Sequence, residues 1–144
     1  MTIEKLDGTS PRLYVLVAPL VLRRSVLRQN NVYPFCTSRA HTWFVAWEGE
    51  TVFGFVPVEV TAGGIAKINN YYVSGDDAQL LARFLQRIVD YYRRDYTIRS
   101  VTHLRHAEVF RAEGFVPVRE WKHNLTKEDG NSRQPRTCTT GPSN

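Results

Sequence analysis

The segment from Asp77 to Arg94 has the clearest structural periodicity in this chain of 144 residues. Its apolar side chains recur at the spacing of one helical face, and its charged side chains fall on the opposite face. Asp76 or Asp77 can cap the first turn. The spacing therefore predicts a long amphipathic helix. Its apolar face comprises Leu80, Leu81, Phe84, Leu85, Ile88, Val89 and Tyr92.

The sequence before this helix predicts three antiparallel strands. Residues 41–48 and 51–60 are rich in aromatic and β-branched side chains and are joined by a Glu-Gly-Glu turn. A third strand at 65–73 follows another glycine turn. The first two strands carry large apolar groups at adjacent positions, which predicts a sheet covered on both faces by helices. Pro57 cannot donate to a ladder, so we expect an edge or a bulge there.

The remaining elements are shorter. A strand is expected at 2–6, followed by a helix at 11–24 with Ser10 as its N-cap. The apolar residues of that helix nearly surround its axis, so we expect it to be well buried or broken at Pro19. After the long helix we expect a strand at 96–103, a helix at 105–113 ending at Gly114, and strands at 115–118 and 121–126.

Composition predicts one domain at 1–127 and a disordered tail at 128–144, because the tail is too polar to bury a core. No apolar run is long enough to span a bilayer, and the first residues show no signal peptide, so we expect a cytoplasmic protein with no membrane partner. The net charge of +5 is compatible with a phosphate-bearing cofactor, a nucleic acid or another anionic partner, and is also common among soluble proteins.

The order of these elements resembles the fold of the GNAT superfamily of N-acetyltransferases over residues 2–127. The closest local match is AEVFRAEGFVPVREW, in which a helix ends at Gly114-Phe115 before a final hairpin. The fold class expected from this resemblance is α/β (α+β), with a mixed, mostly antiparallel central sheet of six to seven strands and helices on both faces.

The resemblance implies acyl-CoA-dependent transfer of an acyl group to an amine, with acetyl-CoA or another acyl-CoA as cosubstrate. The cosubstrate would lie where residues 67–74 and 97–103 splay apart. The backbone near Tyr72 and Val73 would bind the pantetheine arm and polarise the thioester carbonyl. Ser74 and Gly75 would stand where the family binds the pyrophosphate at a helix N-terminus.

Three departures from the family pattern bear on this chemistry. The phosphate link is only Ser74-Gly75-Asp76-Asp77, and its two carboxylates would oppose an anion. Phe110 stands at the position of a frequent tyrosine that protonates the leaving thiolate, and a phenyl ring cannot transfer a proton. His103 stands where an asparagine is frequent.

The candidate catalytic residues are His103, Glu59 and Tyr71. His103 could act as base or acid near neutral pH, or simply bond to the backbone. Glu59 could receive a proton directly or through water, or remain solvated. Tyr71 and Tyr72 point to opposite faces of the sheet, so one of them could replace the missing phenol, or both could only pack. His103 and His106 lie three apart, but no further ligand pattern accompanies them and we expect no metal.

Two alternatives to an acyltransferase stay open. One is a nucleic-acid-directed protein on the same scaffold, similar to phage Mom-type DNA modification proteins. The other is a non-catalytic module that kept the scaffold. The acceptor amine could belong to a small molecule or to a protein. The basic stretch at Arg23, Arg24 and Arg28 could bind an anionic acceptor or form a solvated helix face.

Overall fold

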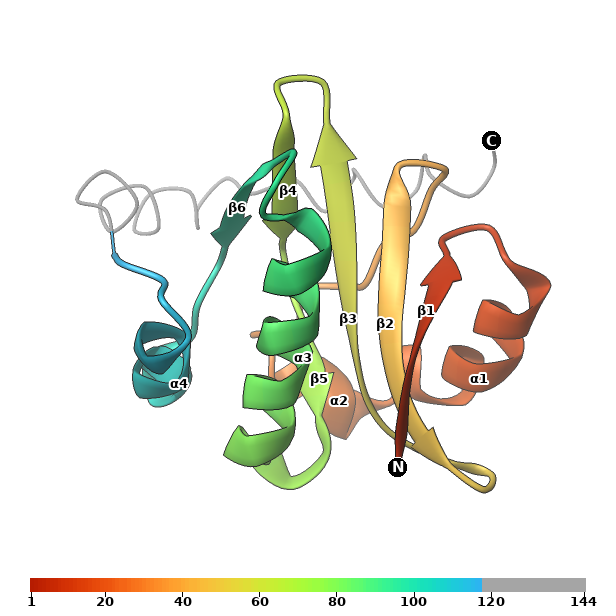
Figure 1. The fold of residues 1–144 in the computed structure, drawn as a ribbon. Helices are drawn as coiled ribbons and strands as arrows, with labels where there is room; N and C mark the ends of the chain where they lie inside the picture. Colours follow the sequence, from red (N-terminus) through yellow and green to blue (C-terminus); the bar gives the residue numbers. More distant parts are fainter. Residues whose placement is uncertain (118–144) are drawn as a thin grey trace.

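The computed structural model describes residues 1–117, which form a six-stranded sheet with helices on both faces (Figure 1). The strand order is β1-β2-β3-β4-β6, and β5 pairs with β3 beside β4. All neighbours are antiparallel except β4 and β6. The predicted fold class is confirmed. The strands are β1 (Thr2–Asp7), β2 (His41–Glu48), β3 (Thr51–Thr61), β4 (Ile65–Ile68), β5 (Tyr72–Val73) and β6 (Thr97–Ser100).

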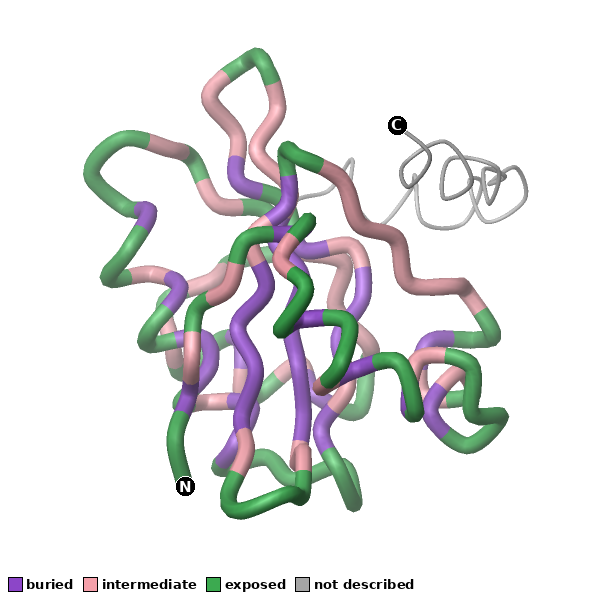
Figure 2. The backbone as a smooth tube through the Cα atoms, turned by 90° about the vertical axis from the view of Figure 1, so that its right-hand side faces the viewer, coloured by how far each residue is buried: buried purple, intermediate pink, exposed green. Residues whose placement is uncertain are grey.

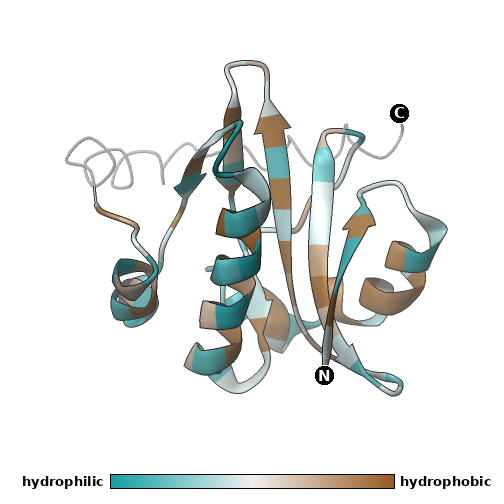
Figure 3. Ribbon diagram, viewed as in Figure 1, coloured by the Kyte–Doolittle hydropathy of each residue, from teal (hydrophilic) through white to brown (hydrophobic). Residues whose placement is uncertain are grey.

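Four α-helices are described: α1 (Pro11–Val21), α2 (Arg24–Arg28), α3 (Ala78–Tyr92) and α4 (Ala107–Ala112). The long helix predicted from periodicity is α3, and Figure 3 shows its hydrophilic and hydrophobic stripes. It begins after Asp77, whose Oδ1 accepts hydrogen bonds from the N–H groups of Gln79 and Leu80 at 2.9 and 3.1 Å. This cap satisfies two of the free amides that every helix start exposes.

Two hydrophobic clusters cover the two faces of the sheet, and the central strands are its most buried part (Figure 2). Consecutive residues of β2 point to opposite faces. Phe44 belongs to the cluster under α3 and α4, while Trp43 and Val45 belong to the cluster under α1 and α2. All three are at most 2% exposed. The prediction of a sheet covered on both faces is confirmed. Neighbouring residues of a strand point to opposite faces, so large apolar groups at adjacent positions require a hydrophobic cover on each side.

The expectation for the first helix is wrong in both of its forms. α1 continues through Pro19 to Val21, and the chain turns afterwards to enter α2. Pro19 removes one hydrogen bond, to the carbonyl of Val15, and Val15 lies on the exposed side where water can replace it. The helix is also only half buried. Its buried residues are Leu13, Val17 and Leu20, whereas Val15 is 75% exposed.

The third predicted strand is interrupted. β3 pairs with both β4 and β5, and between these paired stretches residues 56–57 face residues 69–71, so three residues oppose two. Pro57 lies in this interruption, as its missing N–H predicted. The bulge changes the direction of the chain, so β5 is not collinear with β4 although both strands pair with β3. The site described below is built on this divergence.

The helix predicted at 105–113 is divided into a 3₁₀ turn at Leu104–His106 and α4. It ends as expected at Gly114, whose φ of 95° favours glycine, and the N–H of Phe115 bonds to the Phe110 carbonyl at 3.0 Å. Residues 115–117 form no strand, and the predicted strand at 121–126 and tail at 128–144 lie outside the described residues. Up to residue 117, no helix has the length and apolar character needed to cross a bilayer.

Candidate active site

The site lies where two neighbouring strands diverge. β4 and β6 run parallel as far as Ile68 and Ser100, and the N–H of Val101 extends the ladder to the Ile68 carbonyl at 2.9 Å. Beyond this point β5 pairs only with β3, while residues 101–103 lead away toward α4. We call the space between β5 and residues 101–103 the fork. The predicted splay is therefore present.

The edge of β5 that faces the fork belongs to Tyr71 and Val73. Tyr72 pairs with Phe55 of β3. Because N–H and C=O groups alternate in direction along a strand, the residues on either side of Tyr72 turn theirs away from β3. The backbone groups available to a ligand in the fork are therefore those of Tyr71 and Val73. Of the residues predicted to bind the pantetheine arm, Val73 is on this edge and Tyr72 is not.

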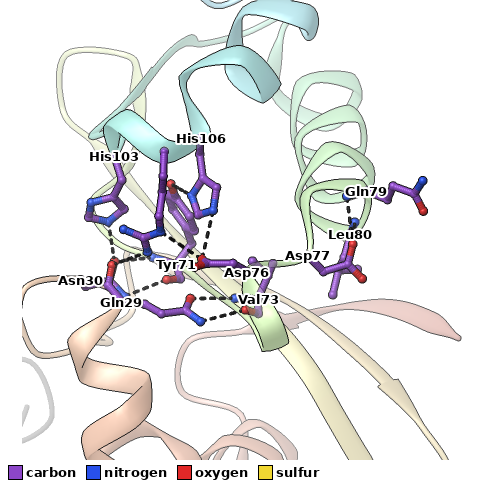
Figure 4. Close-up of polar contacts among 11 residues, drawn as sticks. Gln29, Asn30, Tyr71, Val73, Asp76, Asp77, Gln79, Leu80, His103 and His106 are labelled. Atoms are coloured by element: carbon purple, nitrogen blue, oxygen red, sulfur yellow. Dashed lines mark hydrogen bonds and ion pairs between the residues drawn. The ribbon is translucent and has the colours of Figure 1, made fainter.

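Two side-chain carboxamides already occupy that edge, as Figure 4 shows. Asn30 donates from Nδ2 to the Tyr71 carbonyl at 2.8 Å and accepts at Oδ1 from the Tyr71 N–H at 3.2 Å. Gln29 donates from Nε2 to the Val73 carbonyl at 3.0 Å and accepts at Oε1 from the Val73 N–H at 3.4 Å. We call these two side chains the amide clip. Together they satisfy both donors and both acceptors of the edge.

The amide clip also contacts the other arm of the fork. His103 Nε2 lies 3.2 Å from the same Oδ1 of Asn30, so this carboxamide bridges the diverging strands. Asn30 is only 3% exposed. Arg105 donates from Nη2 to the backbone carbonyl of Gln29 at 2.8 Å, which fixes the clip from the α4 side.

The turn that carries the amide clip has an unusual backbone. Asn31 and Val32 have φ values of 55° and 61°. Asparagine tolerates this left-handed region, but a β-branched residue enters it only at a conformational cost. The Val32 N–H bonds to the Leu27 carbonyl at 2.8 Å, yet the side chain itself is 63% exposed. Packing of Val32 does not explain the conformation, and the turn is held by backbone hydrogen bonds, including that of the Tyr33 N–H to the Asn30 carbonyl at 2.9 Å.

A second polar network lies beside the fork. The Tyr71 hydroxyl is 2.8 Å from His106 Nδ1, and His106 Nε2 is 3.1 Å from Asp76 Oδ1, at an angle that departs from a straight hydrogen bond. Tyr71 and His106 are at most 3% exposed, while about half of the Asp76 side chain is exposed. A carboxylate facing Nε2 favours the proton on that nitrogen, which leaves Nδ1 to accept from the phenol.

Burial raises the pKa of the Tyr71 phenol far above its ordinary value, so this phenol stays protonated at neutral pH. Its ring lies 5.8 Å from that of Phe110, centroid to centroid. Tyr71 thus brings a phenol close to Phe110, where the resemblance in the sequence implied a tyrosine. Tyr72 points to the other face and packs on Phe55 at 5.3 Å, which confirms that the two tyrosines alternate across the sheet.

His103 is neutral at pH 7. Burial, followed by the charges of Arg105 and His106, lowers its pKa to about 4. Its Nε2 faces a carbonyl-type oxygen of Asn30, so the proton of the neutral ring lies on Nε2 and the Nδ1 lone pair is free to accept. An imidazole with this pKa is a weak proton acceptor, and it carries no extra proton to donate at neutral pH.

His103 should make the protein sensitive to acid. Its folded pKa of about 4 lies below the ordinary value of 6.5, so its contribution to stability is present above pH 6.5 and is lost as the pH falls toward 4. Allowing for solvent screening at this half-buried ring, we expect a loss of about 1–2 kcal/mol. Urea unfolding of the wild type and of His103→Gln at pH 7.0 and about pH 4.5 measures it.

Glutamine can keep the donor to Asn30 but does not titrate, so His103→Gln should lose less stability on acidification than the wild type does. Burial also lowers the pKa values of His41 and His106, so part of the acid sensitivity should remain in the variant. Equal losses in the two proteins would show that His103 is not held neutral by the fold.

The turn predicted to bind the pyrophosphate is short in the structure, and two carboxylates, those of Asp76 and Asp77, lie at the start of the helix that follows it. Ser74 and Gly75 are exposed in a 3₁₀ turn at Ser74–Asp76, where Gly75 has a φ of 67°. The next helix start is capped by Asp77, and Asp76 pairs with Arg105 at 3.1 Å. A phosphate would have to displace one carboxylate from the helix amides and lie beside the other. These residues do not fit a tightly bound pyrophosphate.

The structure brings Tyr71 and His103 together, with ring centroids 5.4 Å apart, and places Glu59 elsewhere. Glu59 accepts from Asn69 Nδ2 at 3.4 Å and pairs across the sheet with His41 and Lys67. No hydrogen bond or ion pair within residues 1–117 links Glu59 to either candidate. The same part of the chain contains no group of three side chains suited to a metal ion.

Sequence reasoning did not identify the amide clip, nor Asp76 as a partner of His106. No sequence spacing predicts that the carboxamides of Gln29 and Asn30 contact a strand more than 40 residues away. For His106 a signal existed, because its spacing of three from His103 marked two imidazoles on one side of a turn. In the structure the neighbours of the His106 ring nitrogens are the Tyr71 phenol and the Asp76 carboxylate.

Comparison with known proteins agrees with this architecture. No family model and no curated protein sequence matches the chain. A predicted acetyltransferase from Clostridium acetobutylicum, solved with acetyl-CoA, is 16% identical with a TM-score of 0.58, covering 83% of this chain and 92% of that one. A GNAT-family acetyltransferase from Streptococcus pneumoniae TIGR4 is 14% identical with a TM-score of 0.54, covering 89% and 91% of the two chains.

An aminoglycoside acetyltransferase from an uncultured soil sample, solved with trehalose, is 11% identical with a TM-score of 0.57, covering 81% of this chain and 89% of that one. Identities this low show the fold alone. The chain therefore has the fold of the GNAT acetyltransferases, as the resemblance in the sequence predicted.

Proposed function

We propose that this protein is an acyl-CoA-dependent N-acyltransferase that transfers an acyl group from a pantetheine thioester to an amine. The observation that carries the proposal is the fork. A strand edge with two donors and two acceptors lies beside a buried phenol, in a fold that a solved neighbour uses with acetyl-CoA. An edge of this kind pairs with a chain that contains amide groups.

The two ends of an acyl-CoA differ in how well they fit this site. The backbone groups of Tyr71 and Val73 match the amide groups of a pantetheine arm once the amide clip is released. The nucleotide end finds no comparable site at α3, because Asp77 caps the helix start and Asp76 adds a second carboxylate. Recognition would therefore rest on the pantetheine arm, with little from the phosphates.

The cosubstrate supplies an activated acyl carbon; attack by the amine forms a C–N bond and breaks the C–S bond, and the freed thiolate needs a proton. In our proposal the Tyr71 phenol donates that proton. The phenol is protonated at neutral pH and lies next to Phe110, which cannot act as a donor. This assignment rests on position, since burial makes the free phenol a weaker acid than a thiol. The fork-facing N–H of Val73 would stabilise negative charge on the thioester oxygen.

His106 and Asp76 would reprotonate the phenol. His106 Nδ1 is 2.8 Å from the Tyr71 oxygen, and the Asp76 carboxylate on the other side of the ring opposes the lowering of the His106 pKa by burial, so it would support an imidazolium formed briefly during proton transfer. Asp76 is partly exposed, so the proton can come from solvent. His103, neutral with Nδ1 free, is the candidate that accepts the proton of the attacking amine, a weak base that would act on the acidic ammonium formed by the attack. Glu59 makes no hydrogen bond to this network within residues 1–117, and its carboxylate accepts from Asn69 instead.

Calorimetric titration tests the proposal. We expect saturable binding of acetyl-CoA and of S-acetylpantetheine with similar affinities, and no binding of ADP, because the fork recognises the arm common to the first two. Absence of binding of both thioesters at millimolar concentration would contradict the proposed function. Much tighter binding of acetyl-CoA than of S-acetylpantetheine would show that the phosphates have a site that the turn at 74–76 does not provide.

A further inference from the structure

We propose that the amide clip is a built-in gate, in which Gln29 and Asn30 hold the edge of β5 closed and must leave it before the acyl donor binds. The inference rests on the proposed function and concerns the regulation of the same site. Its basis is that one set of backbone groups can hydrogen-bond either to the two clip side chains or to the amides of a pantetheine arm. These groups are the N–H and C=O of Tyr71 and of Val73.

A primary carboxamide imitates the hydrogen bonding of a secondary amide. Each clip side chain offers one donor and one acceptor to one residue of the edge, at distances from 2.8 to 3.4 Å. The amides of a pantetheine arm would use the same four groups in the same pattern. A backbone N–H makes one good hydrogen bond at a time, so the side chains and the arm exclude each other.

The closed form is stabilised by hydrogen bonds to three residues, Tyr71, His103 and Arg105. Asn30 is buried and bridges Tyr71 and His103, and Arg105 holds the Gln29 carbonyl at 2.8 Å. Burial of these polar groups means that opening without a replacement leaves donors and acceptors unsatisfied. A ligand that supplies the replacement bonds removes this cost, whereas a ligand without amide groups does not.

The backbone conformation of the turn that carries the clip destabilises the closed form. Asn31 and Val32 are both left-handed, and such a conformation persists in a β-branched residue only when its surroundings impose it. If the turn rearranges when the clip leaves β5, Val32 can return to an ordinary conformation, which would offset part of the cost of opening. The gate is therefore closed without ligand, and the apparent affinity for the donor is reduced by the small fraction of open molecules.

Removing the clip side chains should tighten binding. We expect Gln29→Ala to lower the Kd of S-acetylpantetheine and of acetyl-CoA about threefold, and Gln29→Ala with Asn30→Ala to lower it about tenfold, since the open fraction rises. ADP should bind none of the proteins. The matched control is Gln86→Ala, which removes an exposed carboxamide that bonds Glu113 at 3.2 Å and makes no hydrogen bond to β5, and should leave both Kd values unchanged.

Thermal unfolding and circular dichroism establish that each variant is folded, and Gln29→Ala is the milder change because Gln29 is only half-buried. Tighter binding in the clip variants and not in the control supports the gate. If the wild type binds both thioesters and the folded variants bind them equally or more weakly, the gate is refuted while the proposed function stands. If no protein in the series binds either thioester, both are refuted.

Discussion

Replacing Tyr71 by phenylalanine is expected to slow acyl transfer by about 100-fold, the usual scale of a lost proton donor. The substitution removes one oxygen, which now lies 2.8 Å from His106 Nδ1, and leaves the buried ring against Phe110. The thiolate would then depart without its proton donor. Release of free thiol from acetyl-CoA in the presence of a panel of amines measures the rate, and binding of acetyl-CoA should change little.

Tyr72→Phe is the matched control, because it removes the same oxygen from the adjacent residue on the opposite face of the sheet. We expect its rate to stay within about twofold of the wild type, since surface polar changes away from a network have small effects. Equal rates for the wild type and Tyr71→Phe would exclude Tyr71 as the donor. A similar loss in both variants would indicate a general disturbance of β5.

Substituting Gly54 by alanine is expected to destabilise the protein by about 3 kcal/mol, at the upper end of overpacking costs. A Cβ at this position would lie 2.5 Å from the Tyr72 carbonyl oxygen and 3.2 Å from Phe84 Cε2. The first neighbour is backbone and cannot rotate away, so β5 must move from β3. Urea unfolding measures the loss of stability, and acetyl-CoA binding should weaken with it because β5 carries the edge of the fork.

Gly63→Ala is the control for this substitution. No atom lies within 4 Å of a Cβ added at Gly63, in the turn between β3 and β4. We expect its free energy of unfolding to stay within about 0.5 kcal/mol of the wild type. If Gly54→Ala were equally harmless, the close approach of β3 and β5 would not be a feature of the folded protein.

The parts of the fold that local chemistry determines could be predicted from the sequence. The periodicity of α3 and the cap at Asp77 are local, and the structure confirms both. The hairpin of β2 and β3 is likewise confirmed, as is the irregularity at Pro57. α1 could not be predicted correctly, because its apolar residues are distributed around the axis and only tertiary contacts decide which of them are buried.

The site was less accessible from the sequence because its decisive contacts are long-range. Tyr71 and His103 could be chosen from residue type and position along the fold. The partners that define their chemistry could not be chosen, since Asn30 and His106 meet Tyr71 only when α2 and the turn before α4 close over β5. Glu59 was chosen for its strand position alone, and in the structure its carboxylate accepts from Asn69 and makes no hydrogen bond to Tyr71 or His103 within residues 1–117.

The shared fold and the altered contacts lead to a specific expectation. The scaffold keeps the diverging strands, while the chain supplies its own phenol at Tyr71 and its own occupant of the fork at Gln29 and Asn30. If the scaffold is used for acyl transfer, the donor must exchange with the amide clip. This exchange distinguishes an active site that opens on binding from a scaffold whose fork is permanently filled.

The most direct test is an NMR titration of isotope-labelled protein with acetyl-CoA. We predict that the backbone amide resonances of Tyr71 and Val73 and the side-chain amide resonances of Gln29 and Asn30 change together and saturate at the same concentration, since the ligand replaces the clip at those groups. Resonances of these four residues that stay unchanged at millimolar acetyl-CoA would contradict acyl-donor binding in the fork.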